Sequence, residues 1–363
     1  MECIVSKKNM LLLTALFMSI PQFASSFFIG PASSIASVAI TLLSLDSQPV
    51  QPQVGIPTDS DNQLVQMAFK DFDSKRFDAS EKEFTMSINR WNEMNRPRDE
   101  MASLLKARAN VRVDNKDFNH AIEDYNKCIE LMGSDGEDKN GKAVYGEYPD
   151  TFVGRALALE GLADWQGALK DYDKAITLWG GQASTSTDYG KNEEFDISKF
   201  DGINPYVLTF RGNVLSRLGD YEKALKDYDV SSNIFISLRD IARYSDARAN
   251  YALALYQLKR EDEAVKAMND VIRKNPGYAD MHVAIAADAW SRGNYVEALK
   301  EWRFTCDRID VGCEAYKDDE WVSTVRRWPA TLSSKLQQFL RREIPEALKG
   351  KPGDRLAPVT KYQ

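Results

Sequence analysis

Three arginines stand at the same place in three similar stretches of the chain and could form an anion-binding row. They are Arg108, Arg155 and Arg211, and a guanidinium group can hold a carboxylate or phosphate with two parallel hydrogen bonds. Each arginine is followed sixteen residues later by an aspartate, and the similar stretches that lack the arginine also lack the aspartate. The three aspartates are Asp124, Asp171 and Asp227. We therefore favour an ion pair within each stretch over a ligand site.

The remaining residues offer little catalytic or metal chemistry. His120 and His282 are the only two histidines, and their spacing from the four cysteines is not that of a zinc site. An EF-hand loop beginning at Asp135 would need Gly and Glu where Asn140 and Gly146 stand. There is no phosphate-binding glycine loop, dinucleotide fingerprint or nucleophile elbow. We therefore expect no enzyme, no metal and no cofactor; the alternative is an enzyme with an unrecognised site in the groove.

The arginines and aspartates lie within a repeated helix-turn-helix pattern. It is clearest over residues 150–180, where apolar residues recur at helical spacing and the small residues Ala156 and Ala168 predict a close helix crossing. The pattern recurs six times, and we call the small residue of each second helix its anchor. The anchors are Ser80, Ala121, Ala168, Ala224, Ala264 and Ala298. The last two lie 34 residues apart, and the other spacings are longer because residues are added after the second helix.

This period and pattern resemble the tetratricopeptide repeat (TPR). The resemblance implies an all-α, right-handed superhelix of six helix-turn-helix units over residues 61–316, followed by a helical cap over 317–346. Single helices of this length are marginal in water, so the units must stack to bury a shared face. The implied function is protein binding, with a partner peptide or helix in the groove that the first helices line.

Some TPR domains bind the C-terminal carboxylate of chaperone tails through Lys and Asn, then Asn, then Lys and Arg on successive first helices. Lys106 and Asn110 match the first part. Gly154 stands where the second Asn is needed, and Tyr206 and Phe210 replace the last Lys and Arg. We therefore do not expect a chaperone-tail clamp.

The predicted groove is instead apolar and aromatic, with a few polar groups. Such a surface suits an amphipathic helix or an extended peptide. The alternative, for about half of these side chains, is packing against the next unit. The predicted groove residues are Phe69, Phe72, Lys106, Asn110, Val153, Leu157, Tyr206, Phe210, Asn213, Tyr256 and Trp290.

The N-terminus reads as a targeting segment. Lys7 and Lys8 precede an apolar run, as in a signal peptide over residues 1–26. Residues 27–60 then form a transit or linker segment. Small residues before Phe27 resemble the bipartite presequence of proteins sent to complex plastids, although no Arg or Lys lies between Lys8 and Lys70. We expect a plastid location; secretion into an endomembrane lumen and an uncleaved membrane anchor are the alternatives.

The C-terminal region carries two cysteines of interest. Cys306 and Cys313 flank the end of the last repeat, where a disulfide would pin the cap in an oxidising compartment; two free thiols are the alternative. Cys128 is expected in the core. The segment near 180–204 is expected to be a long loop and the tail over 347–363 to be disordered. A net charge of −7 argues against nonspecific nucleic-acid binding.

Several segments, among them VIRKNPGYADMHVAIAADAW and EAYKDDEWVSTVRRWP, resemble a plant and algal family of plastid-targeted TPR proteins. This resemblance covers about residues 61–344. It implies a thylakoid-associated, non-enzymatic scaffold in the assembly or maintenance of a plastid complex. It supplies no ligand residues, and the partner's identity stays open.

Overall fold

The computed structural model describes residues 54–136, 148–179, 203–310 and 312–342. The expected signal peptide, the residues of the transit segment before 54, most of the 180–204 loop and the tail after 342 lie outside this part, so those expectations stay untested. Within the described residues the secondary structure consists of α-helices and short 3₁₀ helices, with no strand.

The helices come in six consecutive pairs, one for each predicted unit. The first three pairs are α2 (Asp59–Asp73) with α3 (Phe77–Glu93), α4 (Arg98–Asp114) with α5 (Phe118–Met132), and α6 (Tyr148–Gly161) with α7 (Trp165–Leu178). The next three are α8 (Pro205–Arg217) with α9 (Tyr221–Ser237), α10 (Ile241–Gln257) with α11 (Glu261–Lys274), and α12 (Ala279–Ser291) with α13 (Tyr295–Arg308). The 3₁₀ helix η2 (Gly133–Gly136) follows α5. The chain then continues through η4 (Glu314–Lys317), α14 (Asp319–Thr324) and α15 (Ala330–Leu340).

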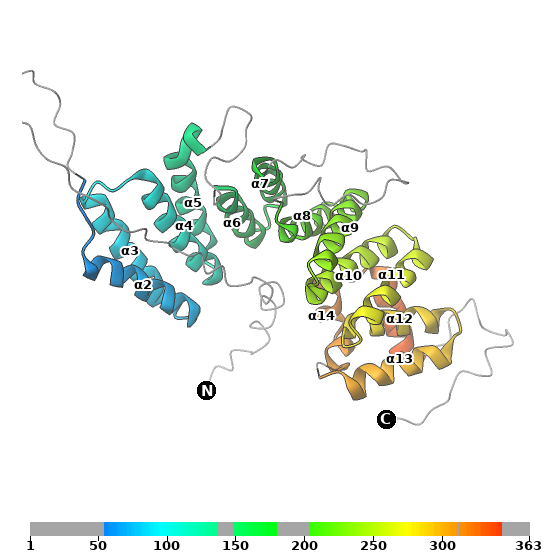
Figure 1. Ribbon diagram of the computed structural model, residues 1–363. Helices are drawn as coiled ribbons and strands as arrows, with labels where there is room; N and C mark the ends of the chain where they lie inside the picture. Colours follow the sequence, from blue (N-terminus) through cyan, green and yellow to red (C-terminus); the bar gives the residue numbers. More distant parts are fainter. Residues whose placement is uncertain (1–53, 137–147, 180–202, 311, 343–363) are drawn as a thin grey trace, which may run out of the picture.

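The pairs stack in chain order. Each helix packs against the helix before it and the helix after it, and Figure 1 shows the units laid side by side from α2 to α13. The exception is α15, which packs back on α12. The array is therefore a solenoid whose last unit is covered by the C-terminal helix.

The small residues sit where the two helices of each unit cross. All six anchors are fully buried, and the facing first-helix positions are Ala or Gly. At Gly212 an added Cβ would lie 2.7 Å from the Tyr228 ring, so only glycine fits this crossing. The residue five before each anchor closes the turn with a positive φ. These residues are Lys75, Lys116, Ala163, Gly219, Lys259 and Gly293.

The predicted arginine–aspartate pairs are confirmed. In each, the guanidinium donates two hydrogen bonds of 2.7–2.8 Å to the aspartate of the second helix, as between Arg211 and Asp227. The third guanidinium nitrogen reaches the second helix of the preceding unit, at Thr85, Asn126 or Asp173. The three arginines therefore join neighbouring units as well as the two helices of one unit.

The C-terminal cap is fixed at several points. Leu332, Leu336 and Phe339 of α15 are fully buried. Asp280, at the start of α12, accepts hydrogen bonds from Arg326 and from the Trp328 indole. Cys306 and Cys313 form a disulfide, which joins the end of α13 to the segment that leads into the cap. Cys128 is buried, as expected.

Candidate functional site

The predicted groove residues fall into three groups. The first group lies in the first helices of units one to three. In this group Phe69 is 39% exposed and meets the Phe84 ring edge-on, while Phe72 packs on Phe77. Asn110 is exposed and its side-chain oxygen accepts a hydrogen bond from Tyr125. The other members of this first group, Lys106, Val153 and Leu157, are partly buried.

Tyr256 and Trp290 do not face an open groove, contrary to the prediction. Tyr256 is 1% exposed and Trp290 is fully buried, because α15 covers this end of the first-helix face. Lys335 of α15 donates to the Tyr256 hydroxyl, and the ring of Phe339 lies 5.4 Å from that of Trp290. The sequence showed two aromatic residues at groove positions, but only the tertiary structure shows that the chain's own C-terminal helix occupies them.

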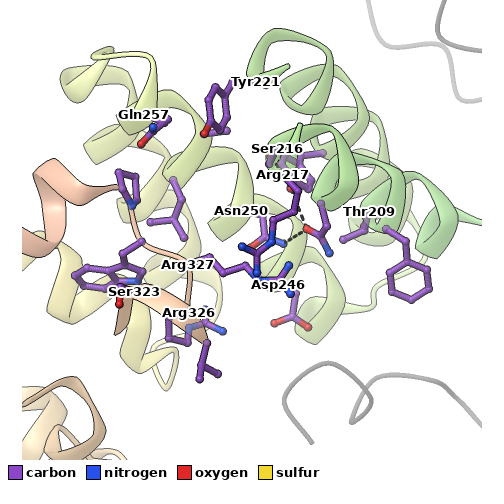
Figure 2. A pocket seen from close by; sticks show the side chains of 18 of the residues that line it. Thr209, Ser216, Arg217, Tyr221, Asp246, Asn250, Gln257, Ser323, Arg326 and Arg327 are labelled. Atoms are coloured by element: carbon purple, nitrogen blue, oxygen red, sulfur yellow. Dashed lines mark hydrogen bonds between the residues drawn. The ribbon is translucent and has the colours of Figure 1, made fainter. Parts of the chain in front are cut away.

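The third group, Tyr206, Phe210 and Asn213, lines a pocket of about 390 Å³. The pocket lies between the first helices of units four and five, α8 and α10, and the segment after α14 closes its far side (Figure 2). Its volume falls in the range of about 300–1,000 Å³ that is usual for ligand sites. This is the candidate site.

Two side-chain amides lie next to each other in the pocket wall. Asn250 donates to Asn213 across 3.1 Å, and Asn213 also accepts from the Tyr228 hydroxyl. These bonds use the Asn213 oxygen and the Asn250 nitrogen. The Asn213 nitrogen and the Asn250 oxygen have no partner among the described residues. The wall therefore offers one free donor and one free acceptor, which is what a peptide group needs.

Four arginines line the same pocket with a single carboxylate, Asp246. Arg326 is paired with Asp280, and Arg243 lies over the Tyr206 ring, 3.5 Å from Asp240. These two arginines have structural partners close by.

The other two arginines have no carboxylate partner in the part of the chain that the structure describes. Arg217 lies over the Trp165 ring. Neither Arg217 nor Arg327 has a carboxylate within 4.0 Å among the described residues. Figure 2 shows their side chains entering the pocket from opposite sides. The pocket is therefore locally positive in a chain whose net charge is −7.

Burial shifts the titration of several groups here. It raises the pKa of Asp246, although the hydrogen bond from Tyr278 opposes that shift. Burial, together with the charge of Arg217, lowers the pKa of Arg327. Burial also raises the pKa of Glu160, in the nearby helix α6, to about 7. The hydrogen bond from Tyr172 and the charges of Arg327 and Arg217 act in the opposite direction, but neither arginine forms an ion pair with Glu160. Arg327 is partly buried and has no ion pair among the described residues, and such a group favours binding of an opposite charge.

The prediction from sequence missed the arginines and Asn250. Arg217 ends a first helix, and Arg327 comes from the cap, which was assigned only a covering role. The sequence signal for Arg327 was the VRRWP run over residues 325–329, which is distinctive but does not match any position of the repeat pattern. Only the folding back of the cap brings it against α8 and α10.

The structure also explains why the chaperone-tail clamp is incomplete. An added Cβ at Gly154 would lie 2.4 Å from the Tyr125 hydroxyl, so an asparagine does not fit there. Tyr206 and Phe210, which stand where the clamp needs Lys and Arg, form the aromatic side of the pocket.

A second hollow, of about 450 Å³, lies over α12 and α13. Its buried polar groups are internal partners: the two ring nitrogens of His282 face Glu301 across 2.6 Å and the Pro276 carbonyl across 2.9 Å. We assign this pair to bracing of the last unit. The described residues contain no group of three or more His, Cys, Asp or Glu arranged to hold a metal ion. None of the described helices combines the length and apolar character needed to cross a membrane.

Comparison with known proteins agrees with this architecture. Tetratricopeptide repeat family models match residues 106–132 and 246–278, within units two and five. The Hsp70-Hsp90 organizing protein of Triticum aestivum is 28% identical over an alignment of 205 residues, and the match covers 54% of this chain. The chain spans about a third of that relative's length, since the match covers 33% of it.

Solved structures give the same fold at low identity. A tetratricopeptide repeat protein from Parabacteroides merdae superposes with a TM-score of 0.51 at 13% identity, covering 83% of this chain and 99% of that one. The apo form of RapI gives 0.54 at 10% identity, covering 78% and 76%. The chain therefore contains tetratricopeptide repeats, and its paired helices form an all-α TPR superhelix.

Proposed function

We propose that this chain is a protein-interaction scaffold that binds an extended peptide segment of a partner in the pocket between α8 and α10. TPR arrays use the extended surface of their stacked units for binding. The observation that carries the proposal is the amide nitrogen of Asn213 and the amide oxygen of Asn250, both unpaired among the described residues, beside the rings of Tyr206 and Phe210. Amides can pair with peptide backbone, and aromatic rings take up apolar side chains.

The proposed role is binding and not catalysis. The titratable lining consists of arginines, tyrosines and Asp246, whose carboxylate already accepts from Tyr278. Arginine stays protonated in proteins and does not serve as a general base. The hydrogen-bonding pattern therefore supports recognition.

The test is a selection of displayed random peptides on the immobilised folded chain. Selected peptides should bind wild type, and Asn250→Ala should lower their affinity about tenfold. The substitution removes the Asn250 amide oxygen as an acceptor for the peptide and removes the hydrogen bond that positions Asn213. Asn269→Ala is the matched control, since Asn269 is exposed on the outer helix of the same unit and bonds only to its own helix. A selection that yields no binder, or binders indifferent to Asn250→Ala, contradicts the proposal.

We further propose that the scaffold works in a plastid, associated with the thylakoid, in assembly or maintenance of a complex. The support is the order of charged, apolar and small residues before Phe27 and the resemblance of the repeat segments to plastid-targeted TPR proteins. A fluorescent fusion of residues 1–60 should enter the plastid. A reporter found only in the endoplasmic reticulum or outside the cell would instead support a secretory-pathway or endomembrane adaptor.

The assembly role has a separate test. Affinity capture of the chain without residues 1–60, followed by mass spectrometry, should recover subunits of a photosynthetic or other membrane complex. Capture that recovers none of these would remove the assembly role while leaving the peptide-binding proposal in place.

A further inference from the structure

The position of Arg327 is set by its two neighbours. Arg326 and Trp328 both donate to Asp280, which is 3% exposed and belongs to α12. Arg327 lies between them with φ of +57°, a conformation that few non-glycine residues adopt. Figure 2 shows its side chain extending into the pocket toward α8. The cap thus places a guanidinium on the groove side of units four and five, although it belongs to neither unit.

Arg217 approaches the same space from the end of α8 (Figure 2). The two like charges influence one another, because Arg217 contributes to the lowered pKa of Arg327. Neither arginine forms an ion pair with a carboxylate among the described residues. Asp246 is engaged by Tyr278, and Glu160 accepts from Tyr172 and lies beyond ion-pair distance of both arginines. Like charges brought together without an ion-paired carboxylate cost free energy, and a bound anion would offset this cost.

The geometry points to an acidic peptide segment: we propose that its Asp or Glu carboxylates meet Arg217 and Arg327 while its backbone pairs with Asn213 and Asn250. This inference rests on the peptide-binding function proposed above and adds the chemistry of the partner. The amides and arginines line one pocket, so a single extended segment can reach both. A locally positive pocket favours a partner segment of the opposite charge.

The test uses the peptides selected on the folded chain. Asp and Glu should be enriched among them, and replacing the enriched Glu by Gln in a synthetic peptide should weaken binding about ten- to hundredfold. Arg327→Gln and Arg217→Gln should each weaken the Glu peptide to a similar degree and leave the Gln peptide nearly unchanged. Lys266→Gln removes one positive charge from the exposed outer face of α11 and should change neither peptide's affinity more than about twofold.

The outcomes separate this inference from the proposed function. The inference is overturned if the selected peptides require Asn250 but are not enriched in Asp and Glu. It is also overturned if the Arg327→Gln variant weakens the Glu peptide and the Gln peptide equally. Both outcomes leave the peptide-binding proposal in place. A third outcome is that the selection yields no peptide, while inorganic phosphate stabilises wild type and does not stabilise Arg327→Gln. This result would show a small-anion site and overturn both proposals.

Discussion

At the scale of single residues, the arginines of the three arginine–aspartate pairs join the two helices of one unit and also bond to the preceding unit. The row of arginines that suggested an anion-binding site is structural. Each guanidinium donates to the aspartate of its own unit and to a side chain of the preceding unit, as Arg211 does to Asp227 and Asp173. The arginines that remain available lie elsewhere, at Arg217 and Arg327. The arginines in the shared register are therefore structural, and the candidate site takes its unpaired arginines from outside that register.

Removing Arg211 should destabilise the chain strongly. Arg211 and Asp227 are 3% and 4% exposed, so Arg211→Ala leaves a buried carboxylate without its partner. We expect a loss of about 3–5 kcal/mol in the free energy of unfolding, measured by urea denaturation. Arg248→Ala is the control: its partner Asp229 is half exposed, and the loss should be about 0–1 kcal/mol. Equal losses in the two variants would contradict the bracing role.

Glu160 should make stability depend on pH. Its folded pKa of about 7 lies above the ordinary value of 4.5, so the folded state binds the proton more tightly than the unfolded state. Stability should therefore fall as pH rises from about 4.5 to about 7, by up to ~3 kcal/mol. Glu160→Gln keeps an acceptor for Tyr172 and should flatten this part of the profile.

The measurement is urea unfolding of both proteins at pH 5 and pH 8. Wild type and variant should differ little at pH 5, and the variant should be the more stable at pH 8. A variant that is less stable than wild type at pH 8 would show that the ionised carboxylate is favourable, through Arg327 and Arg217.

At the scale of elements, α15 acts as an internal occupant of the groove. It covers Tyr256 and Trp290, two positions that the repeat pattern assigns to a partner. Through Asp280, the start of α12 also positions the residues that close the candidate pocket. The cap therefore ends the solenoid and limits the open groove to the units before it.

Phe339→Ala should loosen this cap. The Phe339 side chain is fully buried, with ring centroids 5.4 Å from those of both Trp290 and Trp302. Removing it leaves a cavity, and we expect a loss of about 3–5 kcal/mol together with a change in tryptophan fluorescence. Gln338→Ala, in the same helix, should stay within about 0.5 kcal/mol of wild type. An unchanged unfolding curve for Phe339→Ala would mean that α15 contributes little to the last unit.

At the scale of the whole molecule, each unit contacts mainly its neighbours, so stability is distributed along the array. The cross-unit arginines and the stacked first helices carry coupling over one unit at a time. A local defect should therefore have a local effect.

Phe84→Ala tests this distribution. Phe84 is fully buried in unit one, far along the array from the cap. Amide hydrogen exchange should become faster in α2, α3 and α4, while α12 and α13 keep their protection. Phe339→Ala should give the mirror image. Uniformly faster exchange over all units in either variant would indicate one cooperative body instead.

The sequence alone determined the repeat, the helix pairs, the close crossings and the arginine–aspartate braces. These features are local, because they depend on spacings within one unit or between adjacent units, and helical periodicity makes such spacings readable. Ala168, Arg211 and Asp227 could be placed in this way without any coordinates.

Only the tertiary structure decided which groove positions are open. Tyr256 and Trp290 obey the repeat pattern, yet α15 covers them, while Arg327 lies outside the pattern and lines the pocket. The physical reason is that the cap returns to the array through contacts with no fixed period, chiefly the bonds of Asp280 to Arg326 and Trp328 and the packing of α15 on α12.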